Sequence, residues 1–524
     1  MRSLRPRRPL LPAALLALAL AGPQVLAAQS LEEFEKRVTL HRLDNGWIFI
    51  ILERPEAPVF SFATLVDVGA AQEVPGITGL AHMFEHMAFK GTPNIGTKDW
   101  EAEQKALETL EAAYQSWQTE RLRPSPDAAR LEELEKKFRD AQQEAAQYVE
   151  ANEFGDIINR AGGVGLNAFT SSDFTGYFYS LPANKLELFA YLESERFLHP
   201  VFREYYKERD VVQEERRLRT ESQPIGRLIE QFLSTAFIAH PYHQPVVGYM
   251  SDLQSISITD ARAFYEKHYA PTNMVTTIVG DVDAQEVMPL LQTYFGRIPA
   301  GGEPEPLRTV EPPQIAERTV VIEDPSQPIY LEGYHVEAVT GPDAVVYDAI
   351  DDILSRGRTS RLFRRLVRDE KAAVQAGSFS GLPGEKYPGL WIAFAVPAKG
   401  RSNEEAQTSI REEIERLKRQ PVSDAELQKF RTRARADLIR SLDSNQGLAF
   451  ALAEYQQLFG DWRELFGYLE KVEAVTAEDI QRVARETFTA QNRTVGKIVT
   501  EAAEQPAAPQ EAPAEQPAEE EASR

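Results

Sequence analysis

The stretch Gly79-Leu80-Ala81-His82-Met83-Phe84-Glu85-His86-Met87-Ala88-Phe89-Lys90-Gly91-Thr92 contains the most specific pattern in the sequence. Residues 79–89 have the pattern of a helix. His82 and His86 are one helical turn apart, so both imidazoles leave the same face of that helix, and Glu85 borders this face. The spacing therefore predicts three polar side chains grouped on one side of a single helix.

This group has the composition of a catalytic zinc site. Two neutral imidazoles can hold zinc at roughly 2.0–2.1 Å. A carboxylate beside them can take a proton from the attacking water and deliver it to the leaving amine of an amide. The order His-x-x-Glu-His is that of the inverzincin (HxxEH) motif. We expect His82 and His86 to be metal ligands and Glu85 to be the catalytic base.

An ordinary structural role is the alternative explanation of the motif. The chain has only eight His residues, so a chance occurrence of this pattern is on the order of one in a hundred. Two helix histidines satisfied by ordinary hydrogen bonds would show the same spacing. His240 and His243 form a second pair, but they flank Pro241 in a predicted loop, where a structural role is favoured over metal binding.

A catalytic zinc site needs a third protein ligand and leaves its fourth position to water. No third His lies nearby in sequence, so a distant carboxylate is the natural candidate. The helical stretch 205–215 supplies several acidic residues. Glu208 and Glu215 share one helix face, whereas Glu214 is rotated by about 100° from Glu215. Spacing alone does not choose among them, and such acids often form only a solvated helix face.

Strand patterns precede the motif, and a helical hairpin follows it. Residues 37–67 are rich in apolar and β-branched residues, and Asp44-Asn45-Gly46 is a hairpin signal. Residues 98–152 instead show two apolar seams of helical period separated by a Pro-rich breaker, which predicts an inserted antiparallel helical hairpin. A packed structural arm is favoured over a dedicated partner-binding arm.

The second part of the chain echoes the first. Residues 300–316, rich in Pro and Gly near their start, indicate a linker. On its two sides, Ser257-Ile258-Thr259-Asp260 and Thr476-Ala477-Glu478-Asp479 each open a predicted helix that is followed by a β-type run. Both openings are variants of the capping box. The echo indicates two domains of similar fold.

The two ends of the chain have different compositions. Residues 1–27 combine a basic start, an apolar core and small residues near Ala27, which predicts a cleaved export signal; an uncleaved anchor is the alternative. Residues 501–524 contain too few apolar side chains to form a core, which predicts a disordered acidic tail. We expect an exported, periplasmic or secreted protein with no stable membrane insertion after cleavage.

Composition excludes several classes of function. The chain has no Cys, which rules out disulfides, thiolate catalysis and Cys-ligated zinc. Its formal net charge is −22, and neither terminal segment accounts for this excess. Nucleic acid is therefore not an expected partner, because phosphate binding needs a basic face.

Several stretches carry a resemblance to one family. The stretch from Gly79 to Thr92 resembles the active-site helix of the pitrilysin/insulinase zinc metallopeptidases. Residues 163–178 (GVGLNAFTSSDFTGYF) are similar to that family's Gly-rich turn and Asn-Ala-Tyr-Thr strand. Residues 207–215 resemble its Glu-Arg-Asp-Val-(x)₃-Glu helix, and residues 360–373 resemble its second-domain signature. The likeness spans residues 36–500 apart from the helical hairpin.

The resemblance implies an α+β fold of two similar α/β-roll domains, which form half of a clamshell. The first would be a zinc-binding peptidase domain at 36–299 with the hairpin inserted at 98–152. The second would be a domain of similar fold at 317–500. Because complete family enzymes enclose substrate between two such halves, this chain resembles the two-domain subfamily that dimerises.

The resemblance also implies roles for individual residues. Glu215 would be the third ligand of one zinc ion per chain, and Glu208 a supporting acid behind the ligands. Asn167, Ala168 and Phe169 would lie on a strand edge that holds the peptide substrate as an added strand. An ordinary core-facing strand is the alternative for these three residues.

One departure from the family pattern bears on the partner. The family carries an Arg in its second domain, followed seven residues later by a Tyr, and both reach the substrate near the scissile bond. This chain keeps Arg368 but has Gln375 at the second position. We therefore expect a heterodimer with a sister subunit that carries the Arg/Tyr pair; a homodimer is the alternative.

Together these observations predict a zinc metalloendopeptidase or oligopeptidase that hydrolyses extended or unfolded peptides inside a chamber. The chain would be the catalytic subunit of its complex. The alternative is a non-catalytic subunit that captures peptides or serves assembly. The intact His/Glu motif argues against that alternative, because inactive sister chains of the family typically lose it.

Overall fold

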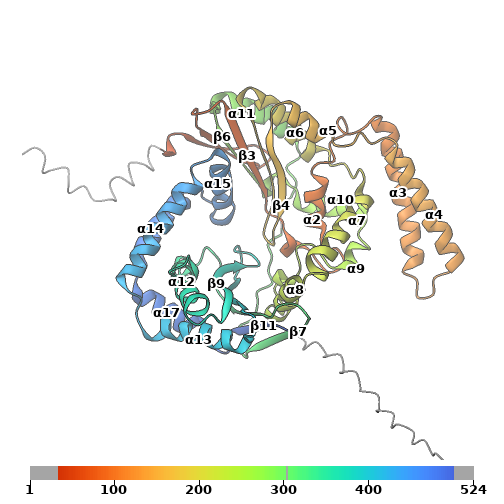
Figure 1. Cartoon of the computed structure of the whole chain (residues 1–524). Coiled ribbons are helices and arrows are strands. Elements are labelled where there is room, and N and C mark those ends of the chain that lie inside the picture. Colours follow the sequence, from red (N-terminus) through yellow and green to blue (C-terminus); the bar gives the residue numbers. More distant parts are fainter. Residues whose placement is uncertain (1–33, 303–304, 501–524) are drawn as a thin grey trace, which may run out of the picture.

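A computed structural model describes residues 34–302 and 305–500 (Figure 1). The expected export signal at 1–27 and the expected acidic tail at 501–524 lie outside the described residues. Across the described ranges, we find no helix with both the length and the apolar character needed to cross a membrane.

The first half of the chain is built around a six-stranded mixed sheet of order β1-β2-β6-β3-β5-β4. β2 and β6 run parallel, and the other neighbouring strands pair antiparallel. The predicted hairpin around residues 44–46 is confirmed as the β1–β2 pair. The strands are β1 (Val38–Arg42), β2 (Ile48–Glu53), β3 (Val59–Val66), β4 (Val164–Thr170), β5 (Thr175–Pro182) and β6 (Met274–Gly280).

The second half repeats this topology with one strand fewer. Its sheet has the order β7-β11-β8-β10-β9, which matches β2-β6-β3-β5-β4 strand for strand, including the parallel pair. The α+β fold class is therefore confirmed. The strands are β7 (Arg318–Glu323), β8 (Ile329–His335), β9 (Ala373–Leu382), β10 (Leu390–Pro397) and β11 (Arg493–Val499). The expected linker at 300–316 has no helix or strand in its described residues.

Helices pack against both sheets, and α3 and α4 stand apart from them (Figure 1). Those of the first half are α2 (Leu80–Met87), α3 (Trp100–Arg121), α4 (Ala128–Ala146), α5 (Glu153–Arg160), α6 (Leu186–Leu198), α7 (Tyr205–Arg216), α8 (Pro224–Ala236), α9 (Met250–Leu253), α10 (Ile258–His268) and α11 (Ala284–Tyr294). Those of the second half are α12 (Ala344–Ser355), α13 (Asn403–Arg419), α14 (Asp424–Ser441), α15 (Asn445–Phe459), α16 (Glu464–Ala474) and α17 (Ala477–Thr487). Shorter helical turns are η1 (Ala70–Gln72), η2 (Ala183–Lys185), η3 (Arg217–Glu221), η4 (Pro241–His243), η5 (Pro271–Asn273), η6 (Phe295–Arg297) and η7 (Phe363–Asp369).

The sequence echo has a structural counterpart in α10 and α17. Each helix begins with the predicted capping box, in which Ser257 or Thr476 exchanges hydrogen bonds with an Asp three residues on. Each leads into an interior strand of its sheet, β6 or β11, which has one parallel and one antiparallel neighbour. The repeat therefore lies at equivalent points of the two sheets.

Each half of the chain contributes one helix to the other half. α15 packs on β3 and β6 of the first sheet, and α8 packs on β7 and β11 of the second (Figure 1). Both contacts are apolar: Leu448 and Leu452 of α15 pack on one face of the first sheet, and Leu228 and Phe232 of α8 pack on one face of the second. Because burying such side chains is a main source of stability, each sheet depends on the other half for its cover.

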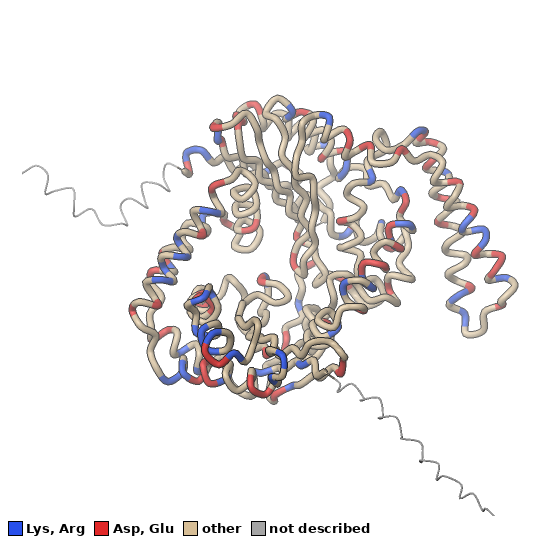
Figure 2. The backbone as a smooth tube through the Cα atoms, in the orientation of Figure 1, with Lys and Arg blue, Asp and Glu red and all other residues tan. Residues whose placement is uncertain are grey.

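The predicted helical hairpin is confirmed as α3 and α4, which project from the first half (Figure 1). Charged residues of both signs alternate along its exposed surface (Figure 2), in pairs one turn apart such as Lys137 with Glu133. Its inner face joins the core of the first half. Buried Glu103 accepts two hydrogen bonds from buried Arg203, at 2.6 and 2.9 Å. The hairpin is therefore held by contacts with the rest of the first half as well as by contacts between its own two helices.

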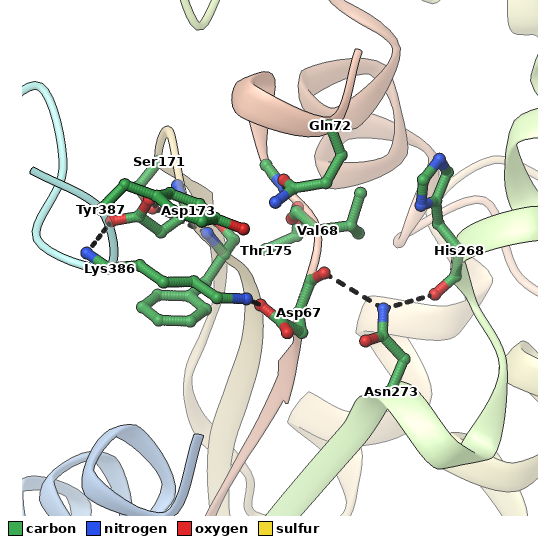
Figure 3. Close-up of polar contacts among 12 residues, drawn as sticks. Asp67, Val68, Gln72, Ser171, Asp173, Thr175, His268, Asn273, Lys386 and Tyr387 are labelled. Atoms are coloured by element: carbon green, nitrogen blue, oxygen red, sulfur yellow. Dashed lines mark hydrogen bonds and ion pairs between the residues drawn. The ribbon is translucent and has the colours of Figure 1, made fainter. Parts of the chain in front are cut away.

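The two halves also meet at a polar contact (Figure 3). The Asp173 side chain is 2% exposed and accepts hydrogen bonds from the N–H groups of Glu385 and Lys386, at 2.7 and 3.1 Å. It also accepts one from the Tyr242 hydroxyl at 2.6 Å. Beside it, the Lys386 ammonium pairs with Asp67. A loop of the second half is therefore held against the turn that follows β4.

Candidate metal centre and active site

The predicted active-site helix is confirmed as α2, which follows β3 in the chain and packs beside β4. Its core face is formed by Leu80, Met83 and Phe84, all buried. His82 and Glu85 project from another face. The apolar residues thus fix the rotation of the helix, and this rotation brings the predicted polar group toward α7.

Three side chains converge where α2 faces α7. Among the described residues, one group of at least three His, Cys, Asp or Glu side chains has its ligand atoms within 4.8 Å of one another: His82, His86 and Glu215. The Glu215 Oε2 atom lies 3.7 Å from His82 Nε2 and 3.3 Å from His86 Nε2. Zinc ligands at about 2.0–2.1 Å in a tetrahedron are separated by about 3.3–3.4 Å. The spacing fits zinc.

The pKa of His82 also fits a metal ligand, which must be a neutral imidazole. Burial, reinforced by the charge of His86, lowers the pKa of His82 to about 4, so His82 is neutral at pH 7. Its buried Nδ1 atom has no hydrogen-bond partner among the described residues. In His86, burial lowers the pKa, but the hydrogen bond and charges of nearby carboxylates outweigh it and raise the pKa overall. A metal cation bound here would offset the negative charge of the nearby carboxylates, which otherwise favours protonation of His86.

Glu208 lies behind His86. Its Oε2 atom is 3.4 Å from His86 Nδ1, the nitrogen turned away from Glu215. Lys90 donates to the other oxygen of Glu208 at 2.5 Å and to Glu204 at 2.9 Å. Burial raises the pKa of Glu208, but hydrogen bonds with His86 and Lys90 bring it down to about 2. The carboxylate can therefore orient the His86 ring, as partners of metal-bound histidines commonly do.

Glu85 stands beside the cluster and is not part of it. Its Oε2 atom is 3.9 Å from His82 Nε2. Burial raises the pKa of Glu85, and a hydrogen bond from Thr170 of β4 acts in the opposite direction. A carboxylate whose pKa is raised above its ordinary value is a better proton acceptor.

The geometry separates the acids that helical spacing could not. Glu215 lies in the cluster, Glu208 lies behind His86, and the Glu214 side chain is 62% exposed and pairs with Arg217. Arg219, one turn after Glu215, lies 2.5 Å from its second carboxylate oxygen. This pair leaves Oε2 of Glu215 facing the histidines.

The expected substrate strand is β4, at the edge of the first sheet. Asn167 is exposed, Ala168 is buried, and Phe169 packs near Phe450 of α15. β4 pairs with β5 on one side, and among the described strands none pairs with its other side. An edge strand with free backbone groups can accept an added peptide strand.

Arg368 is the predicted site residue that the fold does not bring to the cluster. It lies on η7 in the second half, where its side chain is 55% exposed and pairs with Asp369. Gln375 is exposed on β9, the strand that corresponds to β4 in the second sheet. In the described chain neither residue contacts the His and Glu ligands.

The His240 and His243 pair is structural. The His240 Nδ1 atom accepts the Tyr242 N–H at 3.2 Å, and His243 Nδ1 lies 2.8 Å from the His240 carbonyl oxygen. These hydrogen bonds hold the short turn η4 (Pro241–His243).

A pocket of about 260 Å³ opens beside Glu85 and His86. Lys90 and Glu204 line one side, and residues 149–154 line the other. Those residues are the end of the helical hairpin and the start of α5. The inserted arm therefore shapes the surface next to the expected reaction centre.

Sequence reasoning missed Lys90, Thr170 and Arg219. Arg219 follows Glu215 by one turn, so helical spacing could have indicated it, whereas Lys90 lies after the end of α2 at Met87. Thr170 ends the stretch that resembles the substrate strand, but its contact with Glu85 depends on how β4 meets α2. That contact has no local signal in the sequence.

Comparisons with known proteins agree with this geometry. Residues 49–118 match the model for "Insulinase (Peptidase family M16)", and residues 255–433 match that for "Peptidase M16 inactive domain". The chain is 32% identical to the zinc protease PqqE of Helicobacter pylori over 82% of this chain and 85% of that protein. It is similar to the crystal structure of a protease from Helicobacter pylori, with a TM-score of 0.73, 28% identity, and coverage of 88% and 99% of the two chains. The periplasmic protease PqqL of Escherichia coli shares the fold, with a TM-score of 0.65, 18% identity, and coverage of 89% and 48%.

Proposed function

The chain belongs to the insulinase family of zinc proteases, peptidase family M16, and we propose that it hydrolyses extended or unfolded peptides at the site described above. His82, His86 and Glu215 would hold one zinc ion per chain, and Glu85 would act as the catalytic base. The observation that carries this proposal is the meeting of three ligand atoms from α2 and α7 beside an independent carboxylate.

The protein's own groups divide the reaction between them. His82, His86 and Glu215 would hold the zinc ion, whose Lewis acidity would make a water molecule nucleophilic at neutral pH. Glu85 accepts a proton from the attacking water and returns it to the leaving amine. Glu208 holds the ring of His86 through Nδ1, and Thr170 holds the Glu85 carboxylate. Burial raises the pKa of Glu85, which makes this carboxylate a stronger base towards the attacking water.

Substrate would bind as a strand along β4. Asn167, Ala168 and Phe169 would present their backbone groups to the peptide, which is supported by the position of β4 at the sheet edge and next to α2. Backbone recognition depends on an extended conformation more than on side chains. It therefore favours unfolded peptides over folded proteins.

The partner would be a sister subunit of similar fold that closes a chamber over the site. The support is chemical: Arg368 is exposed, and exposed Gln375 occupies the place where the family has Tyr. A chain without that hydroxyl lacks one of the two groups that would hold the substrate near the scissile bond. A homodimer is the alternative arrangement.

Export to the periplasm completes the proposal, together with a division into domains at 36–299 and 317–500. The pattern of residues 1–27 supports export. The name of the Escherichia coli protein with the same fold, a periplasmic protease, supports the same compartment. The matched strand orders on either side of residues 300–316 support the domain division.

The decisive experiment uses the purified chain, alone and mixed with a sister subunit, on an unstructured fluorogenic peptide. We expect one zinc ion per chain, hydrolysis that a chelator abolishes, and recovery on adding zinc back. Glu85→Gln should keep its zinc and lose about 10²–10⁴-fold in turnover. Near-normal turnover by the zinc-loaded variant would overturn the assignment of the base. Peptide binding without turnover in every mixture would favour the non-catalytic alternative.

A further inference from the structure

The start of α2 lacks a side-chain cap of its own. The residue at the cap position is Gly79, at φ 93°, and it has no side chain to accept the free N–H groups of the first turn. A larger residue would not fit there, because a Cβ atom on Gly79 would lie 2.8 Å from both the Val247 carbonyl and the Leu253 side chain. The polar end of the metal helix must therefore be satisfied from elsewhere.

Glu73 supplies that missing cap. Its Oε2 atom accepts the Gly79 N–H at 2.8 Å, and its Oε1 atom accepts the Ala81 N–H at 2.7 Å. A carboxylate at a helix N-terminus also interacts favourably with the helix dipole. Both oxygens are thus used on the two residues that lead into His82.

Glu73 makes these two hydrogen bonds from a fully buried position. The residue is 2% exposed, and among the described residues no Lys or Arg lies within ion-pair distance. Burial raises the pKa of Glu73 to about 8, against the effect of the two N–H groups, so the ionised form is costly here. The two short N–H contacts therefore hold this buried carboxyl at the helix start in spite of the cost of burying it.

Glu73 is itself held in place by the turn after β4. The N–H groups of Ala70 and Ala71, in η1 just before Glu73, donate to the carbonyls of Ser171 and Ser172, at 3.2 and 3.0 Å. That turn continues into Asp173, the residue that holds the loop of the second half (Figure 3). Glu73 therefore sits between the end of the substrate strand and the start of the metal helix.

We propose that Glu73 is a positioning residue, which fixes the rotation and axial position of α2 and so aligns His82 and Glu85 with Glu215. This inference rests on the proposed function. His82 follows Ala81 directly and Glu85 lies one turn further on, so a shift of the helix start moves a ligand and the base together. Displacements of about 1 Å in such groups can cost about 10²-fold in rate.

The test compares Glu73→Gln with Glu332→Gln. Glu332 is a fully buried carboxylate in the second half that accepts hydrogen bonds from Tyr330, Tyr334 and Arg411. Both variants should lose thermal stability. Only Glu73→Gln should also weaken zinc binding by about 10- to 100-fold, shift the visible spectrum of the cobalt-substituted protein, and lower kcat with little change in KM. The milder Glu73→Asp should fall between the Glu73→Gln variant and the unaltered chain.

Three results would overturn the inference. One is a folded Glu73→Gln protein with an unaltered cobalt spectrum and zinc affinity. Another is an equal loss of both properties in Glu332→Gln. The third needs no variant: fast hydrogen exchange at the Gly79 and Ala81 amides of the unaltered protein would show that no cap protects them. If Glu85→Gln remains active in the same assay, the proposed function fails. The cobalt spectrum of Glu73→Gln would still show whether Glu73 positions the metal ligands.

Discussion

Single acidic residues in this protein differ sharply in what surrounds them. Glu215 and Glu214 are neighbours in the chain, yet one faces two imidazoles and the other faces solvent. We expect Glu215→Gln to lower zinc content strongly and Glu214→Gln to leave it near the level of the unaltered chain. Metal analysis after dialysis against a weak chelator measures both. Loss of zinc only from the Glu214 variant would show that the assigned ligand is wrong.

Asp348 gives a prediction about pH. Burial raises its folded-state pKa to about 6 from the ordinary 3.8, and the hydrogen bond from Tyr468 only partly offsets this. The folded protein therefore retains a proton that the unfolded chain releases. The corresponding stability is present below about pH 4 and is lost as the pH rises through about 6. Asp348→Asn should add about 1–3 kcal/mol to the free energy of unfolding at pH 8 and little at pH 4.

Urea unfolding of both proteins across this pH range measures the difference. Asp437→Asn is a suitable control, because nearby Arg356 and Arg440 lower the pKa of that carboxyl instead. Its effect should have the opposite sign. A constant difference between Asp348→Asn and the unaltered chain at all pH values would contradict the prediction.

At the scale of elements, the ion pair of Glu103 with Arg203 joins the helical hairpin to the loop that follows the metal helix. Arg203 holds Glu103 of α3 and also donates to the carbonyls of Thr92 and Ile95, in the loop that follows α2. Both charged side chains are buried, at 0% and 1% exposure. Glu103→Gln should therefore cost about 3–5 kcal/mol, because it leaves the guanidinium charge unpaired.

Chemical denaturation of the Glu103→Gln protein measures this cost. Glu135→Gln is the matched control, since its pair with Arg139 lies on the exposed face of the same hairpin. That change should alter stability by no more than about 1 kcal/mol. Equal effects of the two substitutions would show that the arm is a free appendage.

Sequence patterns predicted the elements whose signal is local. The apolar period of residues 98–152 indicated the hairpin, and the spacing of His82, Glu85 and His86 indicated their common face. Contacts between segments that are distant in the chain produce no periodic pattern in the sequence. The exchange of α8 and α15 between the halves, and the reach of Glu73 to the start of α2, depend on packing that the sequence does not display. For the same reason, helical spacing left Glu208, Glu214 and Glu215 undecided until α2 and α7 were seen together.

At the scale of the whole molecule, the exchanged helices make the halves dependent on each other. Residues 34–299 alone would lack α15 and expose the apolar face of the first sheet that α15 covers; residues 317–500 alone would lack α8. We expect each half expressed separately to aggregate, and the two halves expressed together to yield a soluble complex. Calorimetry of the intact chain should show one transition. Two well-folded, independent halves would contradict this expectation.

The partner subunit gives the second prediction at this scale. The chain alone should bind zinc but hydrolyse unstructured peptides slowly, because Gln375 cannot supply the hydroxyl expected next to Arg368. Restoring a group that stabilises developing charge is worth about 2.7–4 kcal/mol, or about 10²–10³-fold in kcat. A sister subunit carrying the Arg/Tyr pair should give this gain, and Gln375→Tyr should recover part of it in a homodimer. A fully active chain that no sister stimulates would rule out the heterodimer.

The interior position of β6 and β11 has a consequence for how the chain is made. β6 is the last strand of its sheet to leave the ribosome, yet it lies between β2 and β3 and pairs with both. Until residue 280 has emerged, the β1–β2 hairpin and the strands beside β3 remain separate fragments with bare edges. The second sheet likewise stays incomplete until β11, which lies between β7 and β8, has been synthesised. Because pairing across such long loops is slow, resistance of the nascent chain to digestion should arise late and abruptly in synthesis.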